Sequence, residues 1–89
     1  MAATLPATVL QDDLAVSLAR AMAVANKKAR ELGVDVFQSL ISITQHTLND
    51  SSVWRINYGP KDYVNRRGGD VLIEVDMHDA TIKRVLRGQ

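Results

Sequence analysis

The sequence contains no cysteine. This absence excludes disulfide frameworks, thiolate zinc sites and thiol catalysis, and it leaves the redox compartment open. Charge of one sign is also lacking, because 11 Lys and Arg residues and 10 Asp and Glu residues leave a formal net charge of only +1. Without an overall positive field, the chain is not favoured as a binder of nucleic acid.

Long hydrophobic runs are missing as well. No segment of the sequence approaches the roughly 20 consecutive apolar residues that cross a bilayer, so no membrane association is expected. The stretch from Met1 to Pro6 lacks the basic start and the continuous apolar run of a signal peptide. The expected location is therefore cytoplasmic by default, or extracytoplasmic if a leader has been removed.

The chain does contain enough apolar sequence for one core. Its 89 residues, 46% of them hydrophobic, predict a single domain that spans residues 1–89. A long amphipathic helix is predicted to start between Thr8 and Asp12, with Thr8 and Gln11 as a capping box, and to end at Gly33. Its buried face follows three- and four-residue spacings and comprises Leu14, Leu18, Ala21, Met22, Ala25, Ala29 and Leu32.

The rest of the sequence alternates with period two, which is typical of half-buried strands. The first strand is predicted from Val36 to about Thr47, with Phe37, Ile41 and Ile43 sharing the inner face. In the last strand apolar residues fall on both faces, which indicates either a β-bulge or an edge strand, and we interpret it as an edge. The remaining predicted strands are Val53–Tyr58, Val71–Asp76 and Thr81–Arg87.

One helix followed by four hairpin-connected strands predicts an α+β fold, in which the helix packs across a four-stranded antiparallel meander sheet. The alanines of the helix predict a close approach to the sheet, with large strand residues such as Trp54 filling the core. The other face of the sheet is partly polar, so it is expected to face water or to bind a partner. A two-layer domain of this size can cover such a face by forming a homodimer through the sheet face or the edge strand.

Several short motifs accompany this order of elements: Trp54 to Tyr58, Gly68-Gly69-Asp70, Ile73 to Asp76, and Ile82 in the final strand. On these residues the chain resembles PepSY-like domains over nearly its whole length, and its topology is similar to the wider cystatin-like group. The resemblance implies a non-catalytic module, often extracytoplasmic, that binds a protein or peptide and regulates or inhibits a partner such as a peptidase. The chain departs from the family pattern at Ala80, where a glycine is usual. It also lacks the inhibitory hairpin motif of cystatins, so cystatin-type inhibition is not implied.

Two segments are candidate binding surfaces. The connection Gly59–Gly69 is longer than a hairpin requires, and it contains residue types that are enriched at protein interfaces. Alternatively, Tyr63 and Val64 fold back onto the hydrophobic layer and the arginines are solvated. The second surface is the exposed face of the first strand. The predicted contacts are Lys61, Tyr63, Arg66 and Arg67 in the loop, and Gln38, Leu40, Ser42 and Thr44 on the sheet face.

Residues that could carry chemistry form only weak clusters. Asp76, His78 and Asp79 have no second histidine nearby in the sequence, so we predict that the two aspartates cap a turn rather than bind a metal. His46 is expected to lie on the polar side of the first strand as a surface residue. The sequence shows no nucleophile with an adjacent base and no glycine-rich phosphate loop before a helix. We therefore expect no enzyme, no cofactor and no metal site.

Two alternatives from other functional classes stay open. A small-molecule-binding or enzymatic domain could use a pocket between the helix and the sheet, although few polar groups are expected to point inward there. A nucleic-acid binder could use a basic edge, although stacking aromatic residues are missing. Cations on an edge strand more commonly discourage aggregation. The basic edge would combine Lys83, Arg84 and Arg87 with Arg66 and Arg67.

Overall fold

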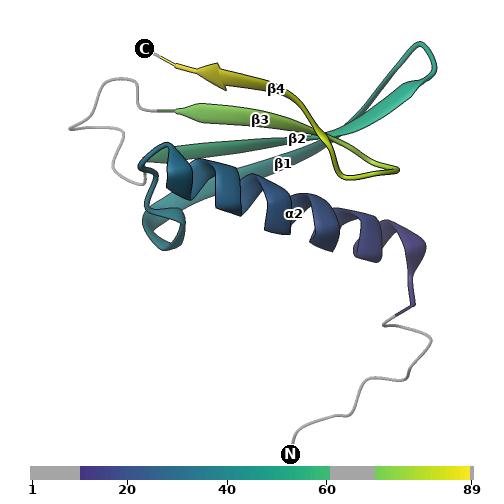
Figure 1. Cartoon of the computed structure of the whole chain (residues 1–89), viewed down its shortest axis with the longest axis horizontal. Helices are drawn as coiled ribbons and strands as arrows, with labels where there is room; N and C mark the ends of the chain where they lie inside the picture. Colours follow the sequence, from purple (N-terminus) through teal and green to yellow (C-terminus); the bar gives the residue numbers. More distant parts are fainter. Residues whose placement is uncertain (1–10, 61–69, 89) are drawn as a thin grey trace, which may run out of the picture.

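The computed structural model describes residues 11–60 and 70–88. The chain forms the helix α2 (Asp13–Glu31), the short 3-10 helix η1 (Val36–Gln38) and the strands β1 (Ser39–Leu48), β2 (Ser51–Pro60), β3 (Val71–Asp76) and β4 (Ile82–Arg87). The strands form one antiparallel sheet of order β1-β2-β3-β4, and α2 lies across one of its faces (Figure 1). The predicted α+β fold, with one helix on a four-stranded meander, is confirmed.

Both ends of α2 are set by local interactions. At the start, the Asp12 carboxylate accepts a hydrogen bond of 2.8 Å from the Ala15 N–H and caps the helix. Thr8, part of the predicted capping box, lies outside the described residues. At the end, Gly33 has a φ of +88°, the left-handed conformation that was predicted for it. Within the described part of the chain, no helix is both long and apolar enough to cross a membrane.

The core lies between α2 and the two central strands. Ala21, Ala25 and Ala29 have no exposed surface, and their small side chains let β2 and β3 approach the helix closely, as predicted. Large strand residues fill the space between the layers. The hydroxyl of Tyr58 has a hydrogen-bond partner there, because it donates a bond of 2.6 Å to Oδ1 of Asn26. The strand residues buried in this core are Trp54, Ile56, Tyr58, Val71, Ile73 and Val75.

Trp54 is 5% exposed, which confirms its predicted place in the core. Its indole Nε1–H donates a hydrogen bond of 2.9 Å to Oγ of Ser17, and the Ser17 hydroxyl donates one of 2.8 Å to the carbonyl of Met77. These two bonds connect β2, α2 and the turn that follows β3. Leu14 was predicted on the buried face but is 49% exposed, because contact with the sheet begins about one turn later, at Ser17 and Leu18.

The first strand begins later than predicted. Residues 36–38 form η1, where the Asp35 side chain accepts a hydrogen bond from the Gln38 N–H, and β1 starts at Ser39. Gln38 therefore does not lie on the strand face, which corrects that prediction. Phe37 is 82% exposed instead of sharing an inner face with the isoleucines of β1.

The hairpin formed by β1 and β2 is longer than predicted. Its turn consists of Asn49 and Asp50, and Ser51 already pairs with Leu48. Asn49 adopts a φ of 58°, a conformation that asparagine tolerates better than most residues. The tip of this hairpin extends away from α2 (Figure 1).

The last strand combines the two features that its sequence pattern suggested. β4 lies at the edge of the sheet, as predicted, and the register of its pairing with β3 shifts between Glu74 and Val75. Glu74 pairs with Arg84 and Val75 pairs with Ile82, so Lys83 is the additional residue of a bulge.

Candidate binding site on the outer face of the sheet

The sheet face that points away from α2, called the outer face below, carries alternate residues of all four strands. Two rows of directly paired residues cross it from β1 to β4. Because α2 covers the opposite face, the side chains of these rows are exposed or half-buried. The first row is Thr44, Arg55, Glu74 and Arg84, and the second is Ser42, Asn57, Leu72 and Leu86.

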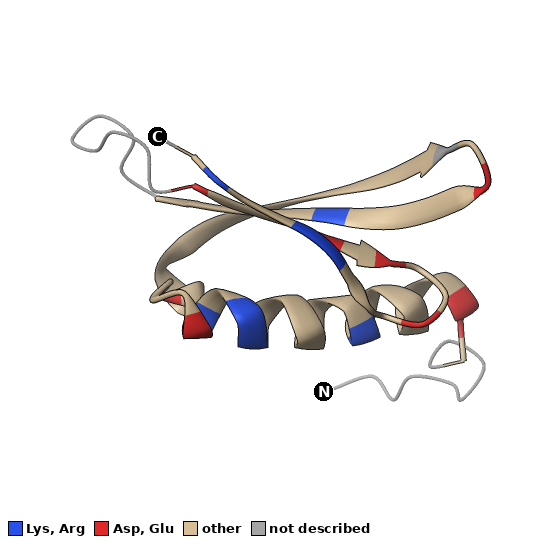
Figure 2. Ribbon diagram, turned by 45° about the horizontal axis from the view of Figure 1, so that its top comes forward, with Lys and Arg blue, Asp and Glu red and all other residues tan. Residues whose placement is uncertain are grey.

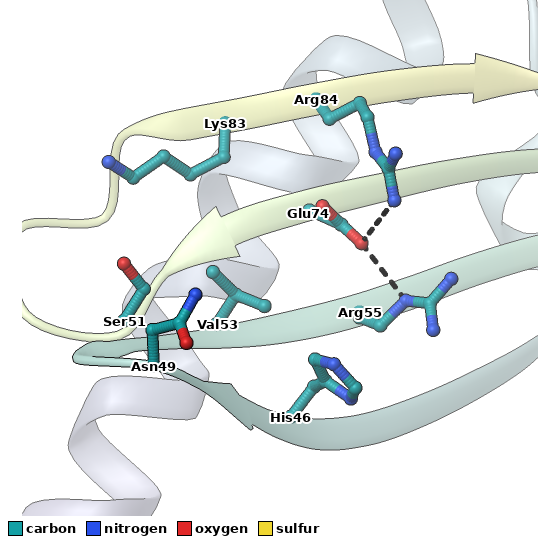
Figure 3. A pocket seen from close by; sticks show the side chains of 8 residues that line it. All are labelled: His46, Asn49, Ser51, Val53, Arg55, Glu74, Lys83 and Arg84. Atoms are coloured by element: carbon teal, nitrogen blue, oxygen red, sulfur yellow. Dashed lines mark hydrogen bonds and ion pairs between the residues drawn. The ribbon is translucent and has the colours of Figure 1, made fainter.

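Two arginines flank one carboxylate in the first row. Nε of Arg55 and Nη2 of Arg84 each lie 3.0 Å from Oε2 of Glu74 (Figure 3). The Arg84 contact is a hydrogen bond. The buried Nε–H of Arg55 has no hydrogen-bond partner among the residues that the structure describes, and it interacts with the carboxylate as an ion pair. The Glu74 side chain is 13% exposed, so its charge is held in a partly desolvated position between the two cations.

A hollow of about 460 Å³ lies beside this row. Among the described residues that form its wall, Arg55, Lys83 and Arg84 are cations and Glu74 alone is a carboxylate. Arg55 of β2 and Arg84 of β4 pair with Glu74 of β3 from its two sides, and Figure 2 shows these basic and acidic positions close together on the sheet. Lys83 points away from Glu74 and lies 3.8 Å from Oδ2 of Asp76 (Figure 3). The polar and apolar residues that complete the wall are His46, Asn49, Ser51 and Val53.

This arrangement is suited to an anionic group. A guanidinium presents five N–H donors in a planar fork that matches a carboxylate or phosphate. Glu74 uses one donor of Arg84 and faces the Nε of Arg55, so both side chains retain donors for a further acceptor. The hydroxyl of Ser51 and the amide of Asn49, which also line the hollow, can donate hydrogen bonds as well. Among the described residues, no three His, Asp or Glu side chains cluster in a way that could hold a metal ion.

The residues predicted for the sheet face do not all lie on it. Ser42 and Thr44 belong to the two rows of the outer face. Leu40 also lies on this side, opposite Gly59 in β2, and is 49% exposed. Gln38 lies outside the strand, in η1. The loop residues Lys61, Tyr63, Arg66 and Arg67 lie outside the described residues, so their role stays a prediction.

The basic edge expected from the sequence is divided between the two faces. Arg84 pairs with Glu74 on the outer face. Arg87 pairs instead with the buried Val71 and donates a hydrogen bond of 3.4 Å to the Leu32 carbonyl at the end of α2. The cations of β4 therefore do not form one continuous patch on one side of the sheet.

The turn between β3 and β4 has the structure that its aspartates predict. Asp76 Oδ1 accepts hydrogen bonds from the N–H groups of His78 and Asp79. Asp79 Oδ1 accepts hydrogen bonds from the hydroxyl and the N–H of Thr81, and these bonds lower the pKa of Asp79. Both aspartates thus cap the turn, as predicted.

Arg55 and Glu74 were not singled out from the sequence, although a weak signal for them exists. Each lies between two buried apolar residues of its strand, so each was predictable as an outward-facing position. His46 lies on the predicted side of β1 but is half-buried and lines the hollow. No protein-family model, curated protein or solved structure matches the chain.

Proposed function

We propose that the protein is a non-catalytic binding module that holds an acidic segment of a protein or peptide partner on the outer face of its sheet. The observation that carries this proposal is the row Arg55, Glu74 and Arg84, in which two guanidinium groups share one carboxylate oxygen at 3.0 Å beside the hollow. Because one carboxylate faces two guanidinium groups there, a carboxylate of the partner would complete the charge balance.

The outer face also provides the neutral contacts that an extended segment needs. Ser42 and Thr44 offer hydroxyl groups, and Leu40 and Leu86 offer exposed apolar surface of 49% and 43%. Alternate side chains of an extended partner segment would meet these rows at the period of the strands. The loop residues Lys61, Tyr63, Arg66 and Arg67 are part of the same proposal as further contacts.

The packing of the core supports this choice over a ligand site between helix and sheet. Such a site needs free volume at the helix face, where Ala21, Ala25 and Ala29 have no exposed surface. The space opposite them is filled by buried side chains such as Trp54 and Tyr58. The hollow that can receive a partner lies on the other side of the sheet.

We also propose that the chain is a PepSY-like domain of the cystatin-like group. The order of one helix and a four-stranded meander supports this assignment. So does the turn before β4, where Ala80 has a φ of 57° at the position at which the family usually carries glycine. A role in regulating or inhibiting a peptidase would follow from membership. Inhibition assays against serine, cysteine and metallopeptidases test that role, and failure to inhibit any class would remove it.

An NMR titration tests the proposed binding surface. The probes are two short extended peptides that differ only in having Glu or Gln at alternate positions. We expect the Glu peptide to shift the amides of Thr44, Arg55, Glu74 and Arg84, and added salt to weaken the effect. Equal shifts with both peptides, or shifts confined to α2, would contradict the proposal.

A pair of variants supplies the matched control for this titration. Arg84→Gln removes one cation of the outer face, whereas Arg20→Gln removes an exposed cation of α2. The proposal expects weaker binding of the Glu peptide by Arg84→Gln and unchanged binding by Arg20→Gln. An equal loss in both variants would indicate nonspecific attraction to positive charge.

A further inference from the structure

The two edges of the sheet differ in how they are protected against pairing with another strand. β4 is six residues long, has a register shift and carries Lys83, Arg84 and Arg87. Charges and bulges of this kind discourage the addition of a further strand. β1, at the opposite edge, is ten residues long and contains no charged residue and no proline (Figure 2). In the described part of the chain β1 pairs with β2 alone, so the backbone donors and acceptors of its outer edge are open to another uncharged strand.

The helix side of β1 also leaves apolar surface exposed. α2 packs against β2 and β3, and the residues of β2 that pair with β1, such as Ile56, are fully buried. Ile43, which is paired with Ile56, is nevertheless 42% exposed, and Ile41 is only partly buried. The apolar layer of the sheet thus continues past the edge of the helix onto β1, where none of the described helices or strands covers it.

We propose that β1 pairs antiparallel with β1 of a second copy of this chain, about a two-fold axis at Ser42. The absence of charge on β1 means that self-pairing brings no like charges together, whereas self-pairing of β4 would juxtapose cations. The occupant is therefore a second copy, because the edge is complementary to itself.

The register follows from the side-chain pattern. Strand pairing must keep Ile41 and Ile43 on the helix side in both copies, since a shift by one residue would move them to the other face. With the axis at Ser42, each Ile41 lies opposite Ile43 of the other copy, and residues 39–45 of both copies pair. In this register two Ile41–Ile43 pairs form across the interface, one on each side of the axis, and all four isoleucines become buried. The two four-stranded sheets join into one. It also places the two outer faces side by side.

Cysteine crosslinking tests the register directly, because the chain has no cysteine of its own. Residues directly opposite each other in an antiparallel pair have Cβ atoms close to the separation of a disulfide. Ser42→Cys should therefore form a covalent dimer under mild oxidation, much faster than Thr44→Cys on the same face of the same strand. Equal rates for the two variants would overturn the proposed axis.

The solution mass tests the dimer without crosslinking. The wild-type chain should sediment at about twice its monomer mass of 9.8 kDa as its concentration rises. Ile43→Lys should remain at the monomer mass, whereas Ile82→Lys should still dimerise, since Ile82 is a comparably exposed isoleucine (37%) on the opposite edge. Circular dichroism would confirm that both variants are folded.

Three results would overturn the proposal. The first is a wild-type protein that stays monomeric at every concentration, and the second is loss of the dimer in both lysine variants. The third is a monomer whose β1 amides shift only when an unrelated extended peptide is added, which would assign this edge to a foreign strand. The titration with the acidic peptide monitors residues of the outer face, whereas the solution mass and the crosslinking monitor the β1 edge. Failure of the dimer and failure of the binding site are therefore distinguishable.

Discussion

Arg55 and Arg84 approach the same oxygen of one carboxylate, Oε2 of Glu74, each at 3.0 Å. The three residues come from neighbouring strands, so the cluster exists only when β2, β3 and β4 pair in this register. Glu74 separates two cations that would otherwise repel each other, and it orients both guanidinium groups at the hollow. The carboxylate therefore has a positioning role as well as a stabilising one.

Substituting Glu74→Gln should lower the free energy of unfolding by about 1 to 2 kcal/mol, because two arginines lose their shared counter-charge at a largely buried position. Urea denaturation measures this loss. Glu31→Gln is the matched control, since Glu31 forms an exposed pair with Lys27 on α2 at 2.9 Å, and its substitution should change stability far less. Equal effects of the two substitutions would show that the cluster of the outer face has no special role in stability.

Replacement of Ser17 by alanine removes the link between the Trp54 indole and the Met77 carbonyl. A buried indole N–H without a partner costs about 1 to 3 kcal/mol. We therefore expect the free energy of unfolding, measured by thermal or urea denaturation, to fall by that amount. Ser39→Ala is the control, because the Ser39 hydroxyl donates to the Asp35 carbonyl at an exposed site. The interpretation would be wrong if Ser17→Ala were as mild as Ser39→Ala.

Stability at high pH should depend on Tyr58. Burial raises the pKa of Tyr58 from 10 to about 12, so the folded state keeps the phenolic proton to a higher pH than the unfolded state does. The resulting stabilisation is fully present below pH 10 and is lost as the pH rises from 10 to about 12. We expect Tyr58 to account for a loss of roughly 2 to 3 kcal/mol across that window.

Tyr58→Phe isolates this effect, because phenylalanine has no proton to release. The variant should be less stable at neutral pH, since Asn26 loses its hydrogen-bond donor. Between pH 10 and 12 its stability should fall less steeply than that of the wild type. Parallel curves for the two proteins would assign the alkaline loss to other groups.

Ala80→Gly should stabilise the protein. A φ of 57° at Ala80 costs a residue with a Cβ about 1 to 2 kcal/mol, and the greater freedom of glycine in the unfolded chain offsets about 0.4 to 1 kcal/mol of the gain. The expected net increase is about 0.5 to 1 kcal/mol. Ala19→Gly, at an exposed position of α2, should instead destabilise by about 0.5 to 1 kcal/mol. A loss of stability in both variants would contradict the account of the turn.

The features predicted correctly from sequence depend on periodicity and on residue size. The spacing of Ala21, Ala25 and Ala29 predicted a helix with a close-packed face, and the alternation around Trp54 predicted a buried strand. Both patterns are local and reflect one dominant force, the burial of apolar surface. The caps at Gly33 and in the turn after β3 were predictable for a similar reason, because they involve only neighbouring residues.

The features that were missed depend on competition between two local structures or on the pairing of residues in different strands. The pattern at Phe37 and Gln38 favoured a strand, but hydrogen bonds to Asp35 stabilise a 3-10 turn there. Alternation of apolar and polar residues does not indicate whether a side chain caps such a turn. The alternation of a single strand shows that Arg55 or Glu74 points outward. It does not show which residue lies opposite, because that depends on the register between strands and on the bulge at Lys83.

The most direct test of the central claim is a double-mutant cycle across the proposed contact. Isothermal titration would measure the affinity of wild type and Arg84→Gln for the Glu and Gln peptides, with Arg87→Gln as the control, since Arg87 lies on the same strand but on the helix side. A contact between Arg84 and a partner carboxylate predicts a coupling free energy of about 1 kcal/mol or more. It predicts no coupling for Arg87. A coupling near zero for Arg84, or equal couplings for both arginines, would contradict the assignment of the outer face as the binding site.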